Sequence, residues 1–114
     1  MNRGDVYDAR LDPTEGSEQA GSRPVIIVSR DAINTNLNIV IVVPCTSHRP
    51  TTRMHPGRVL LHASDGGLGV DSVALCEQVR TVAKTRLLRR RGALLPASLA
   101  QIDRALAITL DLSP

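Results

Sequence analysis

The longest run of β-branched residues in this 114-residue chain is Ile39-Val40-Ile41-Val42-Val43, and it continues into Pro44-Cys45-Thr46-Ser47. A continuous apolar run of this length predicts a central strand that is buried on both faces. We expect that strand to end at Pro44, with Cys45–Ser47 just beyond it. A second apolar run, Val25–Ser29, follows Arg23-Pro24 and predicts another strand, because the residue before a proline is held extended.

Further short strands are expected on both sides of these two. They are Val6–Leu11, Arg58–His62, Val70–Cys76 and Gln78–Val82, of which the last two could form one bent strand. Polar or glycine-rich clusters predict turns and loops at Asp12–Ser22, Asn34–Asn38, His48–Pro56 and Asp65–Gly69. The segment Lys84–Arg91 is interpreted as a basic helical turn.

One helix is expected, at the C-terminal end. It opens at Pro96, and Ser98 with Gln101 three residues on is a capping-box pattern. Apolar residues then recur at helical spacing, at Leu99, Ile102, Leu106 and Leu110. Short strands followed by one helix predict a mainly β fold, a small antiparallel barrel with a C-terminal helix. At this length, residues 1–114 are expected to form a single domain.

The composition is that of a soluble globular protein, with 42% hydrophobic and 22% charged residues. Tyr7 is the only aromatic residue. Lys+Arg is 14 and Asp+Glu is 11, which gives a net charge of +3, and every cation except Lys84 is an arginine. Arginine suits bidentate contact with phosphate. The charge therefore permits a nucleic-acid partner without establishing one.

Several classes of protein are not supported. The start of the chain shows no secretory signal, and the apolar runs are too short to span a membrane, so we expect a cytoplasmic protein. Cys45 and Cys76 make no disulfide framework and are interpreted as reduced, buried, small apolar residues. The chain has no metal-binding cysteine or histidine motif and no P-loop.

Two positions stand out as a candidate site. Arg23 lies where a polar loop enters a buried strand, and Thr46-Ser47 lies where the central strand leaves the core. If the two strands are neighbours, a guanidinium and two hydroxyls meet at the rim of the barrel and could bind a phosphate. On spacing alone, a solvated strand end and a turn residue are the simpler interpretation.

Other polar residues leave alternatives open. Glu77-Gln78-x-Arg80 interrupts an apolar stretch, so Glu77 is either exposed on an alternating strand or held by a cation. His48, two residues past Thr46, is the best placed of the three histidines for proton transfer, although each could be a surface residue. Arg89-Arg90-Arg91 could follow a phosphate backbone or form a solvated turn.

Taken in order, these residues resemble a known family. The opening Gly4-Asp5-Val6 is followed by Asp12-Pro13-x-x-Gly16-Ser17-Glu18-Gln19-x-Gly21-x-Arg23-Pro24-Val25. Further similar segments are Val43–Ser47, Asp71–Val82 with its Glu77-Gln78-x-Arg80-Thr81, Lys84-x-Arg86-Leu87 and Ile102–Leu106. The chain resembles the MazF/PemK-type toxins over nearly its whole length.

The resemblance implies an SH3-like or CcdB-like barrel that forms a homodimer. It also implies a metal-independent endoribonuclease, with no cofactor, that cuts single-stranded mRNA at a short sequence, and a cognate MazE-like antitoxin whose flexible acidic tail occupies the RNA groove. Arg23 and Thr46 correspond to the catalytic pair of the family, and Asp12–Ser22 to the loop beside the RNA channel. The expected substrate-binding residues are Ser17, Glu18, Gln19, Ser47, Glu77 and Gln78.

The chain departs from some relatives. Ser22 stands where some have histidine, and Leu75 where some have arginine, so the roles of those groups do not transfer. The general base stays open among Arg23, Glu77 and His48. With one aromatic ring available, we expect bases to be recognised by hydrogen bonds and by arginine planes. Two alternatives remain: a non-enzymatic gyrase poison on the same fold, resembling CcdB, and a nucleic-acid-binding barrel without catalysis.

Overall fold

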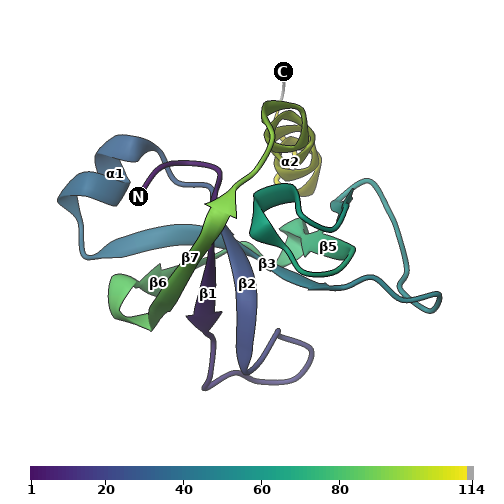
Figure 1. Ribbon diagram of the computed structural model, residues 1–114, viewed down its shortest axis with the longest axis horizontal. Coiled ribbons are helices and arrows are strands. Elements are labelled where there is room, and N and C mark those ends of the chain that lie inside the picture. The colour runs from purple at the N-terminus through teal and green to yellow at the C-terminus, as the bar shows by residue number, and fades with distance from the viewer. Residues whose placement is uncertain (113–114) are drawn as a thin grey trace.

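The computed structural model describes residues 1–112 and contains seven strands and two α-helices (Figure 1). The strands are β1 (Asp5–Arg10), β2 (Ser22–Ile27), β3 (Ile39–Ser47), β4 (Arg58–Leu61), β5 (Ser72–Leu75), β6 (Arg80–Ala83) and β7 (Leu87–Ala93). The helices are α1 (Asp31–Asn36) and α2 (Pro96–Thr109). Single 3₁₀ turns lie at η1 (Asp65–Gly67), η2 (Cys76–Gln78) and η3 (Lys84–Arg86).

All strand pairs are antiparallel, and β3 is the centre of the sheet. The strand order is β4-β5-β3-β2-β1-β7, and β6 also pairs with β3. The first half of β3, Ile39–Val42, pairs with β6, whereas its end, Cys45–Ser47, pairs with β5. The apolar run that predicted a central strand therefore does form one, and the expected mainly antiparallel β fold with a C-terminal helix is confirmed.

The expectation that Pro44 ends the central strand is wrong, because β3 runs on to Ser47. The carbonyl of Ile41 accepts a hydrogen bond from the Val28 N–H at 2.9 Å, so odd-numbered residues of β3 direct their backbone groups toward β2. Pro44 directs its nitrogen to the other side, at the gap where the partner of β3 changes from β6 to β5. A residue without an N–H is tolerated at such a gap.

The sheet is buried on both faces. Ile26 and Val43 belong to one hydrophobic cluster, which Ile102 and Ala105 of α2 complete. A second cluster packs on the opposite face and consists of Ala9, Leu11, Val25, Ile27, Val40, Val42 and Val82, with Tyr7 and Leu87 at its edge. Figure 1 shows α2 on the same side of the molecule as β5, which leaves the far ends of β1 and β2 uncovered by a helix.

The segment interpreted as a basic helical turn is mostly a strand. Only Lys84–Arg86 forms a turn, and β7 then pairs with β1. Arginines of this strand meet aspartates of β1: Arg91 bonds Asp8 at 2.6 Å and Arg90 bonds Asp5 at 3.3 Å. These cross-strand ion pairs allow a run of cations to form an edge strand.

Two smaller expectations are also wrong. The predicted turn at Asn34–Asn38 overlaps α1, because Asn34 is buried and its amide donates to the Ser29 carbonyl at 2.9 Å, which fixes the chain in a helical turn. The predicted capping box of α2 does not form. Leu95 is the N-cap, and the Ser98 hydroxyl instead bonds Asp65 at 2.5 Å.

The two cysteines are buried and free, as expected. Burial, with the neighbouring Cys76 as a lesser cause, raises the pKa of Cys45 to about 12. Burial, with Glu77 as a lesser cause, raises the pKa of Cys76 to about 12. Both thiols therefore stay protonated at neutral pH and act as packing groups. None of the described helices is long and apolar enough to cross a membrane.

Candidate active site

Arg23 of β2 and Thr46 of β3 lie opposite each other at one end of the sheet. The two strands pair with the register Val25↔Pro44, Ile26↔Val43 and Ile27↔Val42. Continued by two residues within the same strands, this register sets Arg23 against Thr46. Directly opposed residues have Cβ atoms about 4.5–5.5 Å apart. The register thus brings both residues to the same strand end, where both line one hollow.

Strand alternation places both side chains on one face. Arg23 shares its face with Val25 and Ile27, and Thr46 shares its face with Val42, and these three valine and isoleucine residues pack in one cluster. Arg23 and Thr46 are each half-buried. The Nε of Arg23 donates to the Ala20 carbonyl at 3.1 Å, and its terminal nitrogens make no hydrogen bond within residues 1–112. They are free to bind an anion.

Two hollows flank this strand end. The first has a volume of about 240 Å³ and is lined by Ser22–Pro24, Cys45–Ser47, Leu68–Val70, Ser72 and Arg91. The second has a volume of about 290 Å³ and is lined by Glu18, Gln19, Pro44 and Glu77–Arg80. Except for Ser17, every residue expected in the site lines one of the two hollows.

The loop 12–22 is held to the site by Gln78. The Oε1 of Gln78 accepts a hydrogen bond from the Gln19 N–H at 2.8 Å, and its Nε2 donates to the Ser17 carbonyl at 3.2 Å. At the start of the loop, Arg86 donates to the Arg10 carbonyl at 3.0 Å and to the Asp12 carbonyl. Gln78, expected to bind substrate, thus has both ends of its amide engaged in positioning the loop.

Replacing Gln78 with Ala will loosen this loop. One net hydrogen bond contributes about 1 kcal/mol, so hydrogen exchange at the Gln19 amide should speed by about threefold to tenfold. Gln78→Glu is the matched variant, because it keeps the acceptor for Gln19 but places a carboxylate against the Ser17 carbonyl. Exchange rates equal to wild type in Gln78→Ala would show that the amide does not hold the loop.

Glu77 is held by a cation, one of the two alternatives left open, but it does not lie on a strand. It belongs to η2, so the alternative of an exposed position on an alternating strand is wrong. Its carboxylate accepts from Arg58 Nε at 3.0 Å and Nη2 at 2.5 Å, and His55 Nε2 lies 3.9 Å away. Partial burial acts to raise the pKa of Glu77, but hydrogen bonds from Arg58 and the backbone and the charges of Arg58 and His55 outweigh it, and the pKa is lowered. A carboxylate of lowered pKa is a weak base.

Removing this cation will raise the pKa of Glu77, as an NMR titration of the side chain should show for Arg58→Gln. The folded-state pKa lies below the unfolded value, so the pair stabilises the fold above the unfolded pKa of about 4.3 and that stability is lost as pH falls through the folded pKa. Arg58→Gln should therefore flatten the loss of stability on acidification. Arg53→Gln is the control, since only the Arg53 carbonyl contacts Arg58. An unchanged titration would contradict the assignment.

The histidines are dispersed. His48 is exposed just past β3, where its backbone N–H donates to the Asp71 carbonyl at 2.8 Å, and no hydrogen bond within the described chain joins its imidazole to Arg23 or Thr46. His62 lines the largest cavity, on another part of the molecule. The described residues contain no group of three or more His, Cys, Asp or Glu side chains that could hold a metal ion.

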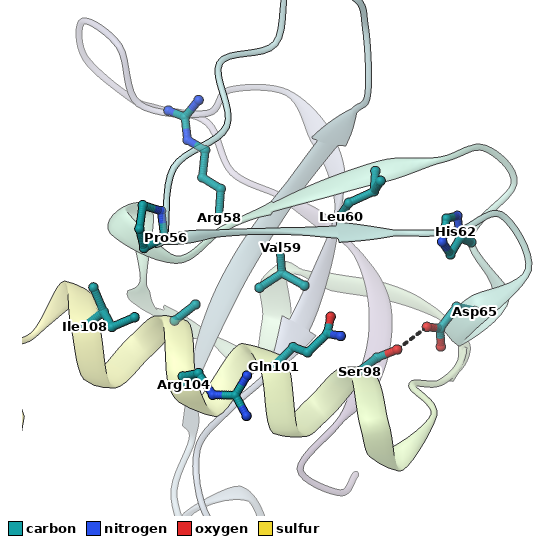
Figure 2. Close-up of a pocket in the computed structure, with 11 residues that line it drawn as sticks. Pro56, Arg58, Val59, Leu60, His62, Asp65, Ser98, Gln101, Arg104 and Ile108 are labelled. Carbon is teal, nitrogen blue, oxygen red and sulfur yellow. Dashed lines mark hydrogen bonds between the residues drawn. The ribbon is translucent and has the colours of Figure 1, made fainter. Parts of the chain in front are cut away.

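The largest cavity, about 530 Å³, lies between β4 and α2 (Figure 2). Figure 2 shows Ser98 turned toward Asp65 across one end, while Arg58 points away from the helix, toward the side where it pairs with Glu77. The lining residues are Pro56, Arg58, Val59, Leu60, His62, Asp65, Ser98, Gln101, Arg104, Ala105 and Ile108. None of them was expected in the site, so the largest cavity and the candidate site are separate.

Arg91 is a site residue that the sequence alone does not predict, although it lines the hollow that Arg23 and Thr46 also line. The run Arg89–Arg91 permits a phosphate contact, but the sequence favours a turn there. If Leu87–Ala93 is treated as a strand, alternation puts Arg89 and Arg91 on one face and Arg90 on the other, so one face of the strand carries two cations.

Comparisons with known proteins agree with the resemblance. The family model described as a PemK-like, MazF-like toxin of type II toxin–antitoxin systems matches residues 2–110. The chain is 42% identical to the endoribonuclease MazF9 of Mycobacterium tuberculosis, over 98% of both chains, and 39% identical to the endoribonuclease MazF of Staphylococcus saprophyticus, over 98% of this chain and 92% of the relative. A solved endoribonuclease from a mycobacterial species, in complex with its cognate antitoxin, superposes with a TM-score of 0.82 at 29% identity, covering 100% of this chain and 98% of that one.

Proposed function

Because the chain belongs to the PemK-like, MazF-like toxin family of type II toxin–antitoxin systems, we propose that it is a toxin that cuts single-stranded mRNA at a short sequence and so stops translation and growth. The observation that carries this proposal is that Arg23 and Thr46 line one hollow at the end of the paired strands β2 and β3. Residues 1–114 act as one catalytic domain. Neither a gyrase poison nor a barrel without catalysis is favoured, since the relatives are named endoribonucleases.

The chemistry needs no metal and no cofactor. The 2′-OH of the nucleotide before the cut attacks the adjacent phosphorus, a P–O bond forms, and the bond to the 5′-oxygen breaks. The 2′-OH loses a proton and the leaving oxygen gains one, which gives a 2′,3′-cyclic phosphate and a 5′-OH. Arg23 and the Thr46 hydroxyl donate hydrogen bonds to the phosphoryl oxygens as negative charge builds on them. DNA is spared because it lacks the 2′-OH.

The ion pair between Arg58 and Glu77 reduces the number of candidates for the general base that accepts the 2′-OH proton. Glu77 is engaged by Arg58 and its pKa is lowered, which disfavours it as general base. Arg23 and His48 remain, and a guanidinium normally stays protonated. Glu77 instead contributes negative charge to the rim of the second hollow, beside Glu18.

Two protein partners are proposed, an antitoxin on the basis of a solved relative and a second copy of this chain on the basis of exposed apolar residues. A solved relative is in complex with its cognate antitoxin, and we propose that this chain also binds a MazE-like antitoxin whose acidic tail pairs with the cations of the site. We further propose a homodimer. Leu60 and Ile108 line the cavity between β4 and α2 and are 38% and 53% exposed, which is the kind of apolar surface that a second copy covers. The protein is proposed to act in the cytoplasm, where mRNA is found.

The test is incubation of the purified protein with a long single-stranded RNA in the presence of a chelator. We expect discrete cuts at one short sequence, fragments that end in a 2′,3′-cyclic phosphate, and no cutting of DNA of the same sequence. Intact RNA, or cutting only after a divalent ion is added, would contradict the proposal. Intact RNA together with inhibited gyrase would identify the poison, and RNA bound without cleavage would identify the non-catalytic barrel.

A further inference from the structure

Arg91 is a second arginine in the hollow beside the candidate catalytic pair. Its side chain is 25% exposed. The Nε donates to Asp8 at 2.6 Å and Nη1 donates to the Gly67 carbonyl at 3.2 Å, while Nη2 makes no hydrogen bond to any described residue. Two fixed bonds orient the guanidinium and leave the N–H groups of Nη2 unused. A guanidinium held in this way is preorganised to donate to an oxyanion.

The contact between η1 and β7 that positions the Arg91 side chain requires glycine at position 67. A Cβ on Gly67 would lie 2.2 Å from the Arg91 carbonyl oxygen, and its φ of +74° is one that other residues rarely adopt. The close approach of η1 to β7 is therefore possible only with glycine there. It brings the Gly67 carbonyl to the Arg91 side chain and closes one side of the hollow.

The charge at this position remains positive after pairing. Asp8 accepts from Arg91 and also lies 3.3 Å from Arg89 Nη2, so two guanidinium groups share one carboxylate. The neighbouring Asp5 is engaged by Arg90. One unit of positive charge is left beside the hollow, which favours an anionic ligand.

The rest of the lining suits a phosphate group. Hydroxyl residues Ser22, Ser47 and Ser72 line the hollow with Arg91, and the Ser72 hydroxyl is already used in a bond to the Val70 carbonyl at 2.9 Å. Ser22 and Ser47 remain as donors. The volume of about 240 Å³ is below that of sites for drug-sized ligands, about 300–1,000 Å³, and fits a small charged group better than a whole base and sugar.

We propose that this hollow is a second phosphate subsite, in which Arg91 binds the backbone phosphate that flanks the scissile one. The inference rests on the proposed function, since the ligand is the same RNA strand. Arg23 and Thr46 line this hollow at the end of their strands, while Arg91 reaches it from the face of the sheet that Asp8 shares with Val6. An RNA strand that passes around this end of the sheet would bring neighbouring phosphates to the two places. A groove that follows the backbone with cations is how single strands are held without reading their sequence.

The first test compares Arg91→Gln with Arg89→Gln in steady-state cleavage of a short RNA that contains one cut site. Arg89 is the matched control: it lies on the same strand and contacts the same Asp8, but its side chain is 70% exposed and does not line the hollow. Loss of one charge-assisted bond should raise KM for Arg91→Gln about tenfold to a hundredfold with kcat within about twofold. Arg89→Gln should stay within about twofold in both.

Two further measurements test whether Arg91 contacts a phosphate: the salt dependence of RNA affinity, and the binding of RNAs in which one phosphate is replaced by an uncharged group. The slope of log affinity against log salt should become shallower by about 0.7 for Arg91→Gln, the value for one phosphate contact on a single strand. A series of RNAs, each with one uncharged methylphosphonate, should contain one position beside the cut that weakens binding by wild type but not further by Arg91→Gln. Arg91→Lys keeps the positive charge but loses the planar guanidinium, so its KM and salt slope should lie between those of wild type and Arg91→Gln. If thermal melting shows that Arg91→Gln is unfolded, Arg91→Lys replaces it in both tests.

The outcomes separate this subsite from the proposed function. If wild type cuts RNA and Arg91→Gln matches it in KM and salt slope, the subsite is overturned while the nuclease stands. If methylphosphonates weaken Arg91→Gln and wild type equally at every position, Arg91 does not contact a phosphate and the subsite is likewise overturned. If wild type does not cut RNA, the proposed function itself is wrong.

Discussion

Arg23→Gln will lower kcat/KM for RNA cleavage by about 10²–10³-fold, the cost of removing one donor that stabilises developing charge. Glutamine is shorter, carries no charge and cannot replace the free terminal nitrogens that Arg23 directs away from its bond to Ala20. The fall should appear mostly in kcat, because the phosphate carries more charge in the transition state than in the bound substrate. Single-turnover cleavage at saturating protein measures it.

Arg30→Gln is the control for this change. Arg30 is exposed and precedes α1, past the opposite end of β2 from Arg23. The Arg30→Gln substitution removes one positive charge, as Arg23→Gln does, but at a residue that lines neither hollow. Its activity should stay within about twofold of wild type, as expected for an exposed residue outside the site. Equal activity in Arg23→Gln and wild type would remove Arg23 from the mechanism.

Thr46→Val will lower kcat by about 10²-fold, since it removes a hydroxyl and keeps the shape of the side chain. Valine is β-branched and suits a strand, so β3 and its pairing with β2 and β5 should persist. The melting temperature should shift by only a few degrees, because Thr46 is half-buried and makes no side-chain hydrogen bond within residues 1–112.

Thr46→Ser distinguishes chemistry from packing. It restores a hydroxyl and removes the methyl group, so it should recover most of the activity that Thr46→Val loses. If Thr46→Ser is as poor as Thr46→Val, a hydroxyl at this position does not by itself restore cleavage, and the account of Thr46 as a hydroxyl donor to the phosphate is contradicted. Rapid-quench measurement of the cleavage step in both variants decides between these results.

The central strand and the candidate pair were predictable from the sequence because their patterns are local. The run Ile39–Val43 can only be a strand or a buried helix, and its length and β-branching favour the strand. Arg23 and Thr46 stood out because each adjoins a buried strand. The pairing of β2 with β3, which depends on packing across the sheet, is what brings them to one strand end.

The features that sequence reasoning missed depend on partners far along the chain. Arg91 was interpreted as part of a solvated turn because Asp8, 83 residues away, gives no local indication of the pairing. For Glu77, the apolar residues that flank it leave two alternatives, an exposed position on an alternating strand or a cation partner. The 3₁₀ turn η2 brings its carboxylate to Arg58, 19 residues away, and this contact helps to lower the pKa of Glu77.

The most direct measurement is a crystal structure of the protein with an RNA that carries 2′-O-methyl at the nucleotide before the cut, which prevents attack. We predict that the phosphorus following that nucleotide lies where the Arg23 guanidinium and the Thr46 hydroxyl both hydrogen-bond its oxygens. A scissile phosphate in the cavity between β4 and α2, or one that contacts neither Arg23 nor Thr46, would contradict the account.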